Sequence, residues 1–302
     1  MFNYGKAVCY SGYRENESPI TKVYPTEAEV LEDLTLLSKN FSYIRMYDPY
    51  QHAQTVLKVI KEHNIPLKVM VGVEPRGEIS NPNCPWGGLH SDEEIKYNKE
   101  VFNFEQLDLL ASLCNKYPDI VMAASVGNEN TSSWHHNLMK PETIASYATY
   151  LKKKISQPVS FCEGGYNWLS HGKVIADAVD FISVHTYPVW LKVPFKKAVE
   201  ATKKDYKDIT KMYPNKPVVF TEFGWPTMSN GPMIKDETNE AFQKAYLDEI
   251  IPWSEKNKVT MFIFEAFDEP WKGSGQPDEP EKHWGIYDVK RNPKAYAKNA
   301  LK

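Results

Sequence analysis

The chain is poor in the residues that build metal, redox or disulfide centres. Its 302 residues include four cysteines, at positions 9, 84, 114 and 162, and no two of them are close in sequence. This spacing excludes a CxxC metal or redox motif. We expect buried free thiols, because cysteine packs as a small apolar residue, although the sequence alone leaves a disulfide open. The one close histidine pair, His135 and His136, is adjacent and points in different directions, so we expect no metal and no other cofactor.

An excess of one charge and long apolar runs are also missing. The formal net charge is −3, so nothing in it suggests a nucleic acid or an anionic membrane as a partner. No apolar run reaches the length of a membrane span. The first residues lack the apolar core of a signal peptide. We therefore expect a cytoplasmic protein, or a secreted or periplasmic one whose signal was removed, and we expect a monomer.

Short apolar segments alternate with longer helical patterns along the chain. The segments are continuously apolar, which is typical of parallel strands covered on both faces. The predicted strands cover residues 7–10, 43–47, 67–73, 120–126, 159–162, 181–184, 218–221 and 260–264. The predicted helices cover residues 27–37, 53–63, 103–117, 141–155, 174–178, 196–212, 239–255 and 294–301.

Eight repeats of strand and helix predict an α/β protein with a (β/α)8 TIM barrel, in which residues 1–302 form a single catalytic domain. The alternative is a doubly wound open sheet, which would predict a glycine-rich phosphate turn after an early strand; the sequence has none. The longest irregular segments, residues 74–93, 130–140 and 270–292, all follow predicted strands. We expect them on the barrel face where active sites form, with an insertion at residues 76–92 closing one end of the cleft.

Two glutamates stand where predicted strands end. Glu129 ends the run SVGNE after the fourth strand, and Glu222 follows the seventh strand in FTEFGWP. They could be structural carboxylates that cap loops, but polar strand-end residues on this face of a barrel usually serve function. Retaining glycoside hydrolysis requires two carboxyl groups about 5–5.5 Å apart, one as acid/base and one as nucleophile. We therefore predict Glu129 and Glu222 as the catalytic residues.

Other strand ends carry polar residues that could support such a pair of carboxyl groups. Arg45 is expected to hold the nucleophile ionised through a charge-assisted hydrogen bond, or to form a salt bridge without catalytic use. Tyr187 could donate to the nucleophile or to the ring oxygen. Asn128 could bind the sugar 2-hydroxyl, a contact that strengthens in the transition state.

Four further residues are expected to support the site. His185 is as readily a hydrogen-bonded core histidine as a ligand contact. Glu269 and Lys272 could form an ion pair that braces Glu129, or a solvated pair on the rim. Tyr47 is a supporting candidate because it ends the second predicted strand, although Tyr47-Asp48-Pro49 also suits a loop-shaping turn.

Aromatic residues are abundant, at 13% of the chain. Trp134, Trp225, Trp271 and Trp284 fall on the predicted active face. Tryptophan offers a flat apolar surface with a polar edge, which suits a sugar ring. Each of these residues is therefore a candidate sugar platform, with a core or loop-anchoring role as the alternative.

Five motifs together resemble those of glycoside hydrolase family 17, in the clan A retaining glycosidases. They are IRMYDP (44–49), VGNE (126–129), TEFGWPT (221–227), FIFEAFDEPWK (262–272) and EKHWGIY (281–287), in matching order and strand position from about residue 7 to the C-terminus. The resemblance implies a (β/α)8 barrel and a retaining enzyme active on β-1,3-glucan. By motif position it gives Glu129 the acid/base role and Glu222 the nucleophile role.

The same resemblance extends to supporting residues. It matches Glu269 and Lys272 to charged residues of the family's strand-8 motif, and four others to supporting positions of the clan: Arg45, Asn128, His185 and Tyr187. The chain departs from the plant members, which read Glu-Thr-Gly-Trp-Pro where Phe223 stands here and carry polar residues where Pro270 and Trp271 stand. These departures bear on substrate length, linkage preference and the fate of the intermediate.

Four functions compete on these grounds. The first is a retaining hydrolase of laminarin-type β-1,3-glucan, and the second is a β-1,3-glucan transglycosylase that forms the same covalent intermediate. The third is a catalytically silent glucan-binding barrel, which predicts loss of a carboxylate, whereas both are present. The fourth is a clan enzyme that acts on β-1,4 linkages, which the contexts of Tyr47 and Trp225 disfavour.

Overall fold

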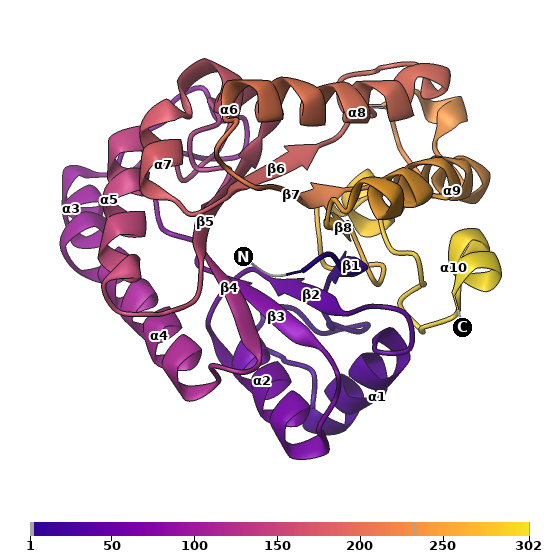
Figure 1. Cartoon of the computed structure of the whole chain (residues 1–302), viewed down its shortest axis with the longest axis horizontal. Coiled ribbons are helices and arrows are strands. Elements are labelled where there is room, and N and C mark those ends of the chain that lie inside the picture. Colours follow the sequence, from indigo (N-terminus) through magenta and orange to yellow (C-terminus); the bar gives the residue numbers. More distant parts are fainter. Residues whose placement is uncertain (1–2, 232, 302) are drawn as a thin grey trace.

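The computed structural model describes residues 3–231 and 233–301, and its strands form one closed parallel barrel in chain order. The strands are β1 (Ala7–Cys9), β2 (Tyr43–Met46), β3 (Lys68–Gly72), β4 (Val121–Asn128), β5 (Val159–Gly164), β6 (Ile182–Thr186), β7 (Val218–Phe223) and β8 (Met261–Ile263). β8 pairs with β1 and closes the barrel. The helices surround the strands (Figure 1). The predicted (β/α)8 barrel is confirmed.

The helices follow the strands in alternation. They are α1 (Glu27–Leu37), α2 (Gln51–His63), α3 (Asp92–Tyr97), α4 (Asn103–Lys116), α5 (Pro141–Lys152), α6 (Gly165–His171), α7 (Lys173–Ala178), α8 (Phe195–Met212), α9 (Glu240–Asn257) and α10 (Ala295–Ala300). A π-helical segment, Asn98–Phe102, joins α3 to α4. α10 packs beside α9 at the C-terminal end of the chain (Figure 1). In the part of the chain that is described, no helix is both long and apolar enough to cross a membrane.

The barrel and its helices share one apolar core, in which the strands are buried on both faces. All four cysteines are buried and free, so the prediction of unpaired thiols is confirmed. Two helices were not predicted. α3 buries none of its residues, so it has no apolar stripe to reveal it, and α6 is a short helix that buries only Gly165 and Trp168.

The strand pairing is irregular where the polar residues lie. The register shifts between Ser125 and Asn128, between Val184 and His185, and between Phe220 and Phe223. An irregularity of this kind re-aims the side chains beside it. β4 and β7 also run beyond their predicted ends, to Asn128 and Phe223, so polar side chains lie at the carboxyl edge of the barrel.

Candidate active site

A cleft of about 290 Å³ opens at the carboxyl ends of the strands. Its walls come from the carboxyl ends of β2, β4 and β7 and from the segments that follow β1, β2, β3, β4 and β8. The predicted site residues that line it are Tyr47, Asn128, Glu129, Glu222, Glu269, Trp271 and Lys272. The structure therefore gathers residues that are up to 225 positions apart in sequence, from Tyr47 to Lys272.

Glu222 is buried near the end of β7 and is surrounded by hydrogen-bond donors. Its Oε1 accepts from Arg45 Nη1 at 2.5 Å and from Tyr47 Oη at 3.0 Å, and its Oε2 accepts from Tyr187 Oη at 2.7 Å. Burial acts to raise the pKa of this carboxyl, but the charges of His185 and Arg45 and the donated hydrogen bonds outweigh burial and lower the pKa to about 2. Glu222 is therefore an anion at any ordinary pH.

The backbone just after β7 lies very close to the backbone just after β8. A Cβ atom on Gly224 would lie 2.2 Å from the carbonyl oxygen of Phe264, the residue after β8. Only glycine allows β7 and β8 to approach so closely at this level. The glycine of the FTEFGWP motif is thus required by packing beside the carboxylate.

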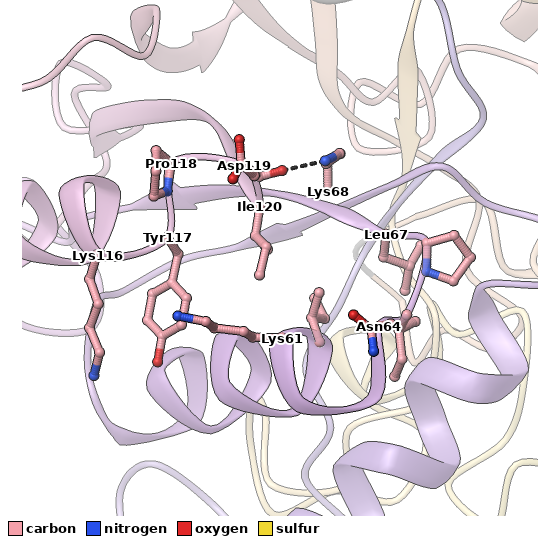
Figure 2. Close-up of a pocket in the computed structure, with 12 residues that line it drawn as sticks. Lys61, Asn64, Leu67, Lys68, Lys116, Tyr117, Pro118, Asp119 and Ile120 are labelled. Atoms are coloured by element: carbon pink, nitrogen blue, oxygen red, sulfur yellow. Dashed lines mark hydrogen bonds between the residues drawn. The ribbon is translucent and has the colours of Figure 1, made fainter.

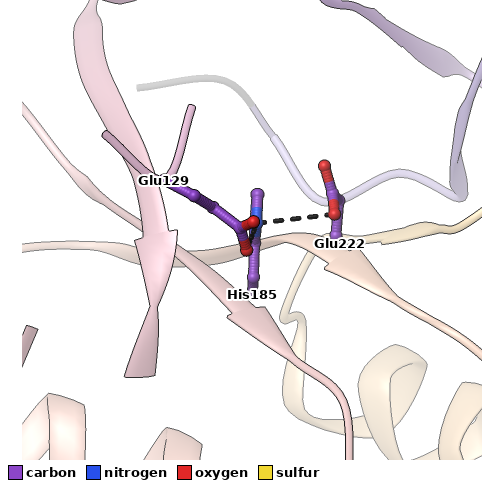
Figure 3. Close-up of side chains that lie close together, drawn as sticks. All are labelled: Glu129, His185 and Glu222. Atoms are coloured by element: carbon purple, nitrogen blue, oxygen red, sulfur yellow. Dashed lines mark hydrogen bonds and ion pairs between the residues drawn. The ribbon is translucent and has the colours of Figure 1, made fainter. Parts of the chain in front are cut away.

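Glu129 follows β4 and projects from a left-handed backbone conformation, with φ 57°. Two backbone hydrogen bonds hold that conformation: its N–H donates to Cys162 O at 2.8 Å, and its carbonyl accepts from Ser132 N at 3.0 Å. Residues held in sparsely populated backbone regions cluster at functional sites. The turn directs the carboxylate of Glu129 toward His185 and Glu222 (Figure 3).

His185 lies between the two carboxylates. Its Nδ1 is 2.8 Å from Glu129 Oε1 and 3.4 Å from Glu222 Oε2. Ligand-type atoms of all three side chains fall within 4.8 Å of one another (Figure 3). Burial acts to lower the pKa of His185, but Glu222, Cys162 and Glu129 raise it to about 10, so the ring carries a positive charge near neutral pH. His185 thus orients Glu129 and offsets the charge of both carboxylates, while the expectation of no metal here stays a prediction.

Asn128 is fixed by the same cation that contacts Glu222. Its Oδ1 accepts from Arg45 Nη2 at 2.5 Å, and its backbone N–H donates to Asn130 Oδ1. Since the amide oxygen is occupied, the amide nitrogen of this cleft-lining side chain is left to donate to a ligand. Arg45 itself is fully enclosed and places no atom in the cleft lining.

Lys272 forms ion pairs with two buried carboxyl groups, those of Glu269 and, at 3.3 Å, Glu265. Burial and the neighbouring Glu269 raise the pKa of Glu265 well above its ordinary value. Of the two predicted alternatives, the ion pair forms, and it is largely buried rather than solvated. It contacts the indole of Trp271, whose Nε1 lies 3.2 Å from Glu269 Oε1, and no described contact joins it to Glu129.

The four tryptophans predicted as sugar platforms differ in their exposure. Trp271 lines the cleft beside Tyr13, with ring centroids 5.9 Å apart. Trp225 and Trp284 are each 1% exposed, which favours the predicted alternative of a core or loop-anchoring role over that of a sugar platform. Trp225 instead packs against Phe195 and donates from Nε1 to a backbone carbonyl, which is the loop-anchoring alternative. Trp134 is exposed outside the cleft lining.

Several cleft residues were not predicted from the sequence. They are Tyr10, Ser11, Tyr13, Pro19, Met46, Asp48, His52, Glu74, Phe264 and Glu281. Glu74 follows β3 as Glu129 follows β4, so the strand-end rule could have found it. Burial and nearby negative charges raise the pKa of Glu74 and of Glu281 to about 7 each. These two further carboxyl groups line the cleft beside the three predicted ones, Glu129, Glu222 and Glu269.

A second hollow, of about 410 Å³, lies at the opposite end of the barrel (Figure 2). It is lined by the segments that lead into β3 and β4, including Lys61, Lys116 and Tyr117. Among its lining residues Asp119 is the one acidic side chain, so it lacks the paired carboxylates of the cleft. Active sites of such barrels form at the carboxyl ends of the strands, which favours the first cleft.

Comparison with known proteins places this geometry in context. A family model, the BtgE/BtgC glycoside hydrolase domain, matches residues 7–285. A probable glucan endo-1,3-beta-glucosidase, btgC, of Aspergillus fumigatus is 26% identical over 300 residues, which is 90% of this chain and 40% of the relative. A glucan 1,3-beta-glucosidase of Arthroderma benhamiae is 26% identical over 227 residues, 68% of this chain and 69% of the relative. The chain thus spans about 40% of the length of the btgC relative.

Two solved structures share the fold. An endo-laminarinase from Formosa Hel1_33_131 superposes with a TM-score of 0.82 at 24% identity, covering 97% of this chain and 85% of that one. A glycoside hydrolase family 17 beta-1,3-glucanosyltransferase from Rhizomucor miehei has a TM-score of 0.74 at 18% identity, covering 96% and 95%. At these identities the likeness shows the barrel fold alone.

Proposed function

The chain belongs to the BtgE/BtgC glycoside hydrolase domain family, and from that premise we propose that it is a retaining β-1,3-glucan hydrolase of glycoside hydrolase family 17. The substrate class follows the named relatives, which are glucan endo-1,3-beta-glucosidases and a glucan 1,3-beta-glucosidase. The family 17 assignment rests on the five sequence motifs. We propose that residues 1–302 act as one catalytic barrel domain.

One observation carries the proposed chemistry: the carboxylates of Glu129 and Glu222 approach within 4.8 Å. Retaining glycosidases hold their two carboxyl groups about 5–5.5 Å apart, whereas inverting enzymes need about 6.5–9.5 Å to admit a water molecule. The separation therefore supports direct attack by one carboxylate on the sugar and is shorter than the inverting geometry needs. The two groups also differ in their surroundings, as an acid and a nucleophile must.

In the first half-reaction an ionised Glu222 oxygen attacks the anomeric carbon while Glu129 donates its proton to the departing glycosidic oxygen. A glycosyl ester of Glu222 forms, and the carbon–oxygen bond to the leaving chain breaks. Arg45 and Tyr187 keep Glu222 ionised and aimed through their hydrogen bonds. In the second half-reaction Glu129 takes a proton from water, which attacks the same carbon and releases the sugar with its configuration retained.

The supporting residues take roles that fit their contacts. Asn128 donates its free amide hydrogens to the sugar 2-hydroxyl, and Tyr47 joins Tyr187 in binding the nucleophile. Trp271 stacks on a sugar ring, and Glu269 and Lys272 fix that indole from behind. Trp225 anchors its loop and takes no part in binding.

A timed product profile with laminari-oligosaccharides of defined length tests this function. We expect products shorter than the substrate, released from β-1,3 chains and absent with β-1,4 controls. Products longer than the substrate would instead indicate a transglycosylase, in which a sugar hydroxyl replaces water in the second half-reaction. No change in any β-1,3 substrate would contradict the proposal.

A further inference from the structure

Two loops that follow the carboxyl ends of β3 and β4 each carry an exposed tryptophan. Trp86 lies in the loop between β3 and α3 and is 65% exposed, and Trp134 lies in the loop between β4 and α5 and is 44% exposed. Their ring centroids are 6.0 Å apart, with the planes inclined by 59°. Tryptophan is highly buried on average, so two neighbouring exposed indoles suggest a binding surface.

Hydrogen bonds join the two loops beneath these rings. Asn81 is buried and donates from Nδ2 to Ser133 O at 2.8 Å and to His135 O at 2.9 Å. Gly77 N donates to Asn137 Oδ1 at 3.0 Å, which joins the loops at a second point. The relative placement of the two indoles is therefore set by buried contacts between the loops and does not depend on the rings alone.

The turn that presents Trp86 is itself tightly constrained. Gly87 has φ +100°, a conformation that residues with a Cβ rarely adopt, and a Cβ on Gly88 would lie 2.7 Å from Asn81 O. Asn81 N donates to Gly88 O across the base of the turn. The glycines let the loop close on Asn81 while Trp86 remains at its tip.

Both loops carry a residue of the cleft at or near their start. Glu74 is the second residue of the β3 loop, and Glu129 is the first residue of the β4 loop. Trp134 is five residues beyond Glu129, so their Cα atoms can be at most about 18 Å apart. Two successive turns, closed by Ser132 N to Glu129 O and His135 N to Ser132 O, shorten that distance further. A chain of a few sugar units that leaves the cleft on this side would reach the rings.

The surroundings of the rings favour a neutral ligand. The groups that join the two loops are side-chain amides, backbone groups and the imidazole of His90, which contacts the carbonyl oxygen of His136. Burial lowers the pKa of His135, whose ring lies 5.5 Å from that of Trp134, to about 4, so this ring is uncharged near neutral pH. Two inclined apolar faces suit a chain that turns at each linkage, as a 1,3-linked glucan does, better than a flat one.

We propose that Trp86 and Trp134 form an outlying platform that binds a β-1,3-glucan chain extending beyond the catalytic cleft. The platform rests on the proposed function. Each indole face stacks on the apolar face of a glucosyl unit and removes both from water. It holds long chains in preference to short ones, because only long chains span the cleft and the rim together.

Substrates of different length distinguish the contribution of the platform from that of the cleft. We compare kcat/KM for soluble laminarin with kcat/KM for laminaritriose in Trp86→Ala, Trp134→Ala and the double variant. The ratio of the polymer value to the trisaccharide value is expected to fall on the order of three- to tenfold for each single substitution. Tyr166→Ala, which removes an exposed aromatic ring after β5, is the matched control and should leave the ratio unchanged.

Retardation in native gels that contain laminarin gives a readout independent of turnover. The Glu222→Gln protein should be retarded, and adding Trp134→Ala should reduce the retardation. An unchanged ratio in the double variant, or an equal loss on both substrates, would overturn the platform; the latter would indicate that the indoles only brace the loop of Glu129. A wild-type enzyme inert on both substrates would overturn the proposed function, and the gels would still decide the platform.

Discussion

At the scale of single residues, the two carboxylates of the cleft differ in their hydrogen-bond donors. Glu222 receives hydrogen bonds from Arg45, Tyr47 and Tyr187, whereas the carboxylate of Glu129 contacts His185. A nucleophile must stay ionised, and a general acid must gain and lose a proton during each cycle. The asymmetry of the contacts matches the proposed division of roles.

Substitution of each glutamate should therefore give a different kinetic result. Glu222→Ala should abolish turnover of every substrate, because no glycosyl ester can form. Glu129→Ala should slow laminarin cleavage on the order of 10²- to 10⁴-fold but spare ester formation from substrates with activated leaving groups, which need no proton. Steady-state rates of the two variants, on laminarin and on a dinitrophenyl β-glucoside of suitable length, measure both effects. Wild-type rates in the Glu222 variant would contradict the assignment.

Removal of the Arg45 charge should move the acid side of the pH profile. The pKa of Glu222 is lowered to about 2 in the folded protein, in part by Arg45, so the carboxylate stays ionised well below its ordinary pKa of 4.5. Arg45→Met removes that attraction and raises the pKa of Glu222, so activity should be lost at a higher pH as the solution is acidified. The pH dependence of kcat/KM measures the shift, and Arg45→Lys, which keeps the charge, should shift less. If Arg45→Met and Arg45→Lys lost activity at the same acidic pH, that result would contradict this electrostatic role.

At the scale of elements, local signals in the sequence predicted some boundaries and missed others. The bounds of α1 agree with the prediction because Thr26 and Glu29 form a capping box, which a sequence shows directly. The predicted ends of β4 and β7 came too early in the chain, because the irregular pairing near those ends depends on neighbouring strands. α3 could not be inferred from periodicity, since it buries no side chain.

Loss of the α1 cap should cost measurable stability. In the native helix Thr26 Oγ1 accepts from Glu29 N, and Glu29 Oε2 accepts from Thr26 N. Thr26→Ala removes the first of these bonds and should lower the free energy of unfolding by about 1 kcal/mol. Thr35→Ala, an exposed substitution in the same helix, should change it by less than about 0.5 kcal/mol. Urea unfolding compares the two, and equal losses would argue against the cap.

At the scale of the whole molecule, ion pairs connect segments that the sequence keeps far apart. Arg291, after β8, binds Asp33 of α1 through Nε and Nη2, both at 2.7 Å, with both side chains buried. Arg45 and Glu222 are likewise 177 positions apart. The sequence predicted the barrel and the two glutamates because strand ends and motifs are local. It could not predict that His185 lies between the two carboxylates or that Trp225 is buried, because both depend on contacts across the barrel.

The link between α1 and the C-terminal segment should matter to stability. Asp33→Ala leaves Arg291 buried without its carboxylate and should lower the free energy of unfolding by roughly 3–5 kcal/mol. Glu32→Ala, its exposed neighbour that pairs with Arg14, should cost less than about 1 kcal/mol. Urea unfolding of both variants tests the difference, and a loss at Asp33 as small as that at Glu32 would show that the buried pair does not stabilise the fold.

The stereochemistry of the first product tests the central claim most directly. Proton NMR during the first minutes of laminari-oligosaccharide cleavage distinguishes the anomers of the new reducing end before they equilibrate. With Glu129 and Glu222 within 4.8 Å, we predict that the β-anomer appears first and the α-anomer grows in later by mutarotation. First appearance of the α-anomer would mean inversion and would contradict the covalent intermediate on Glu222.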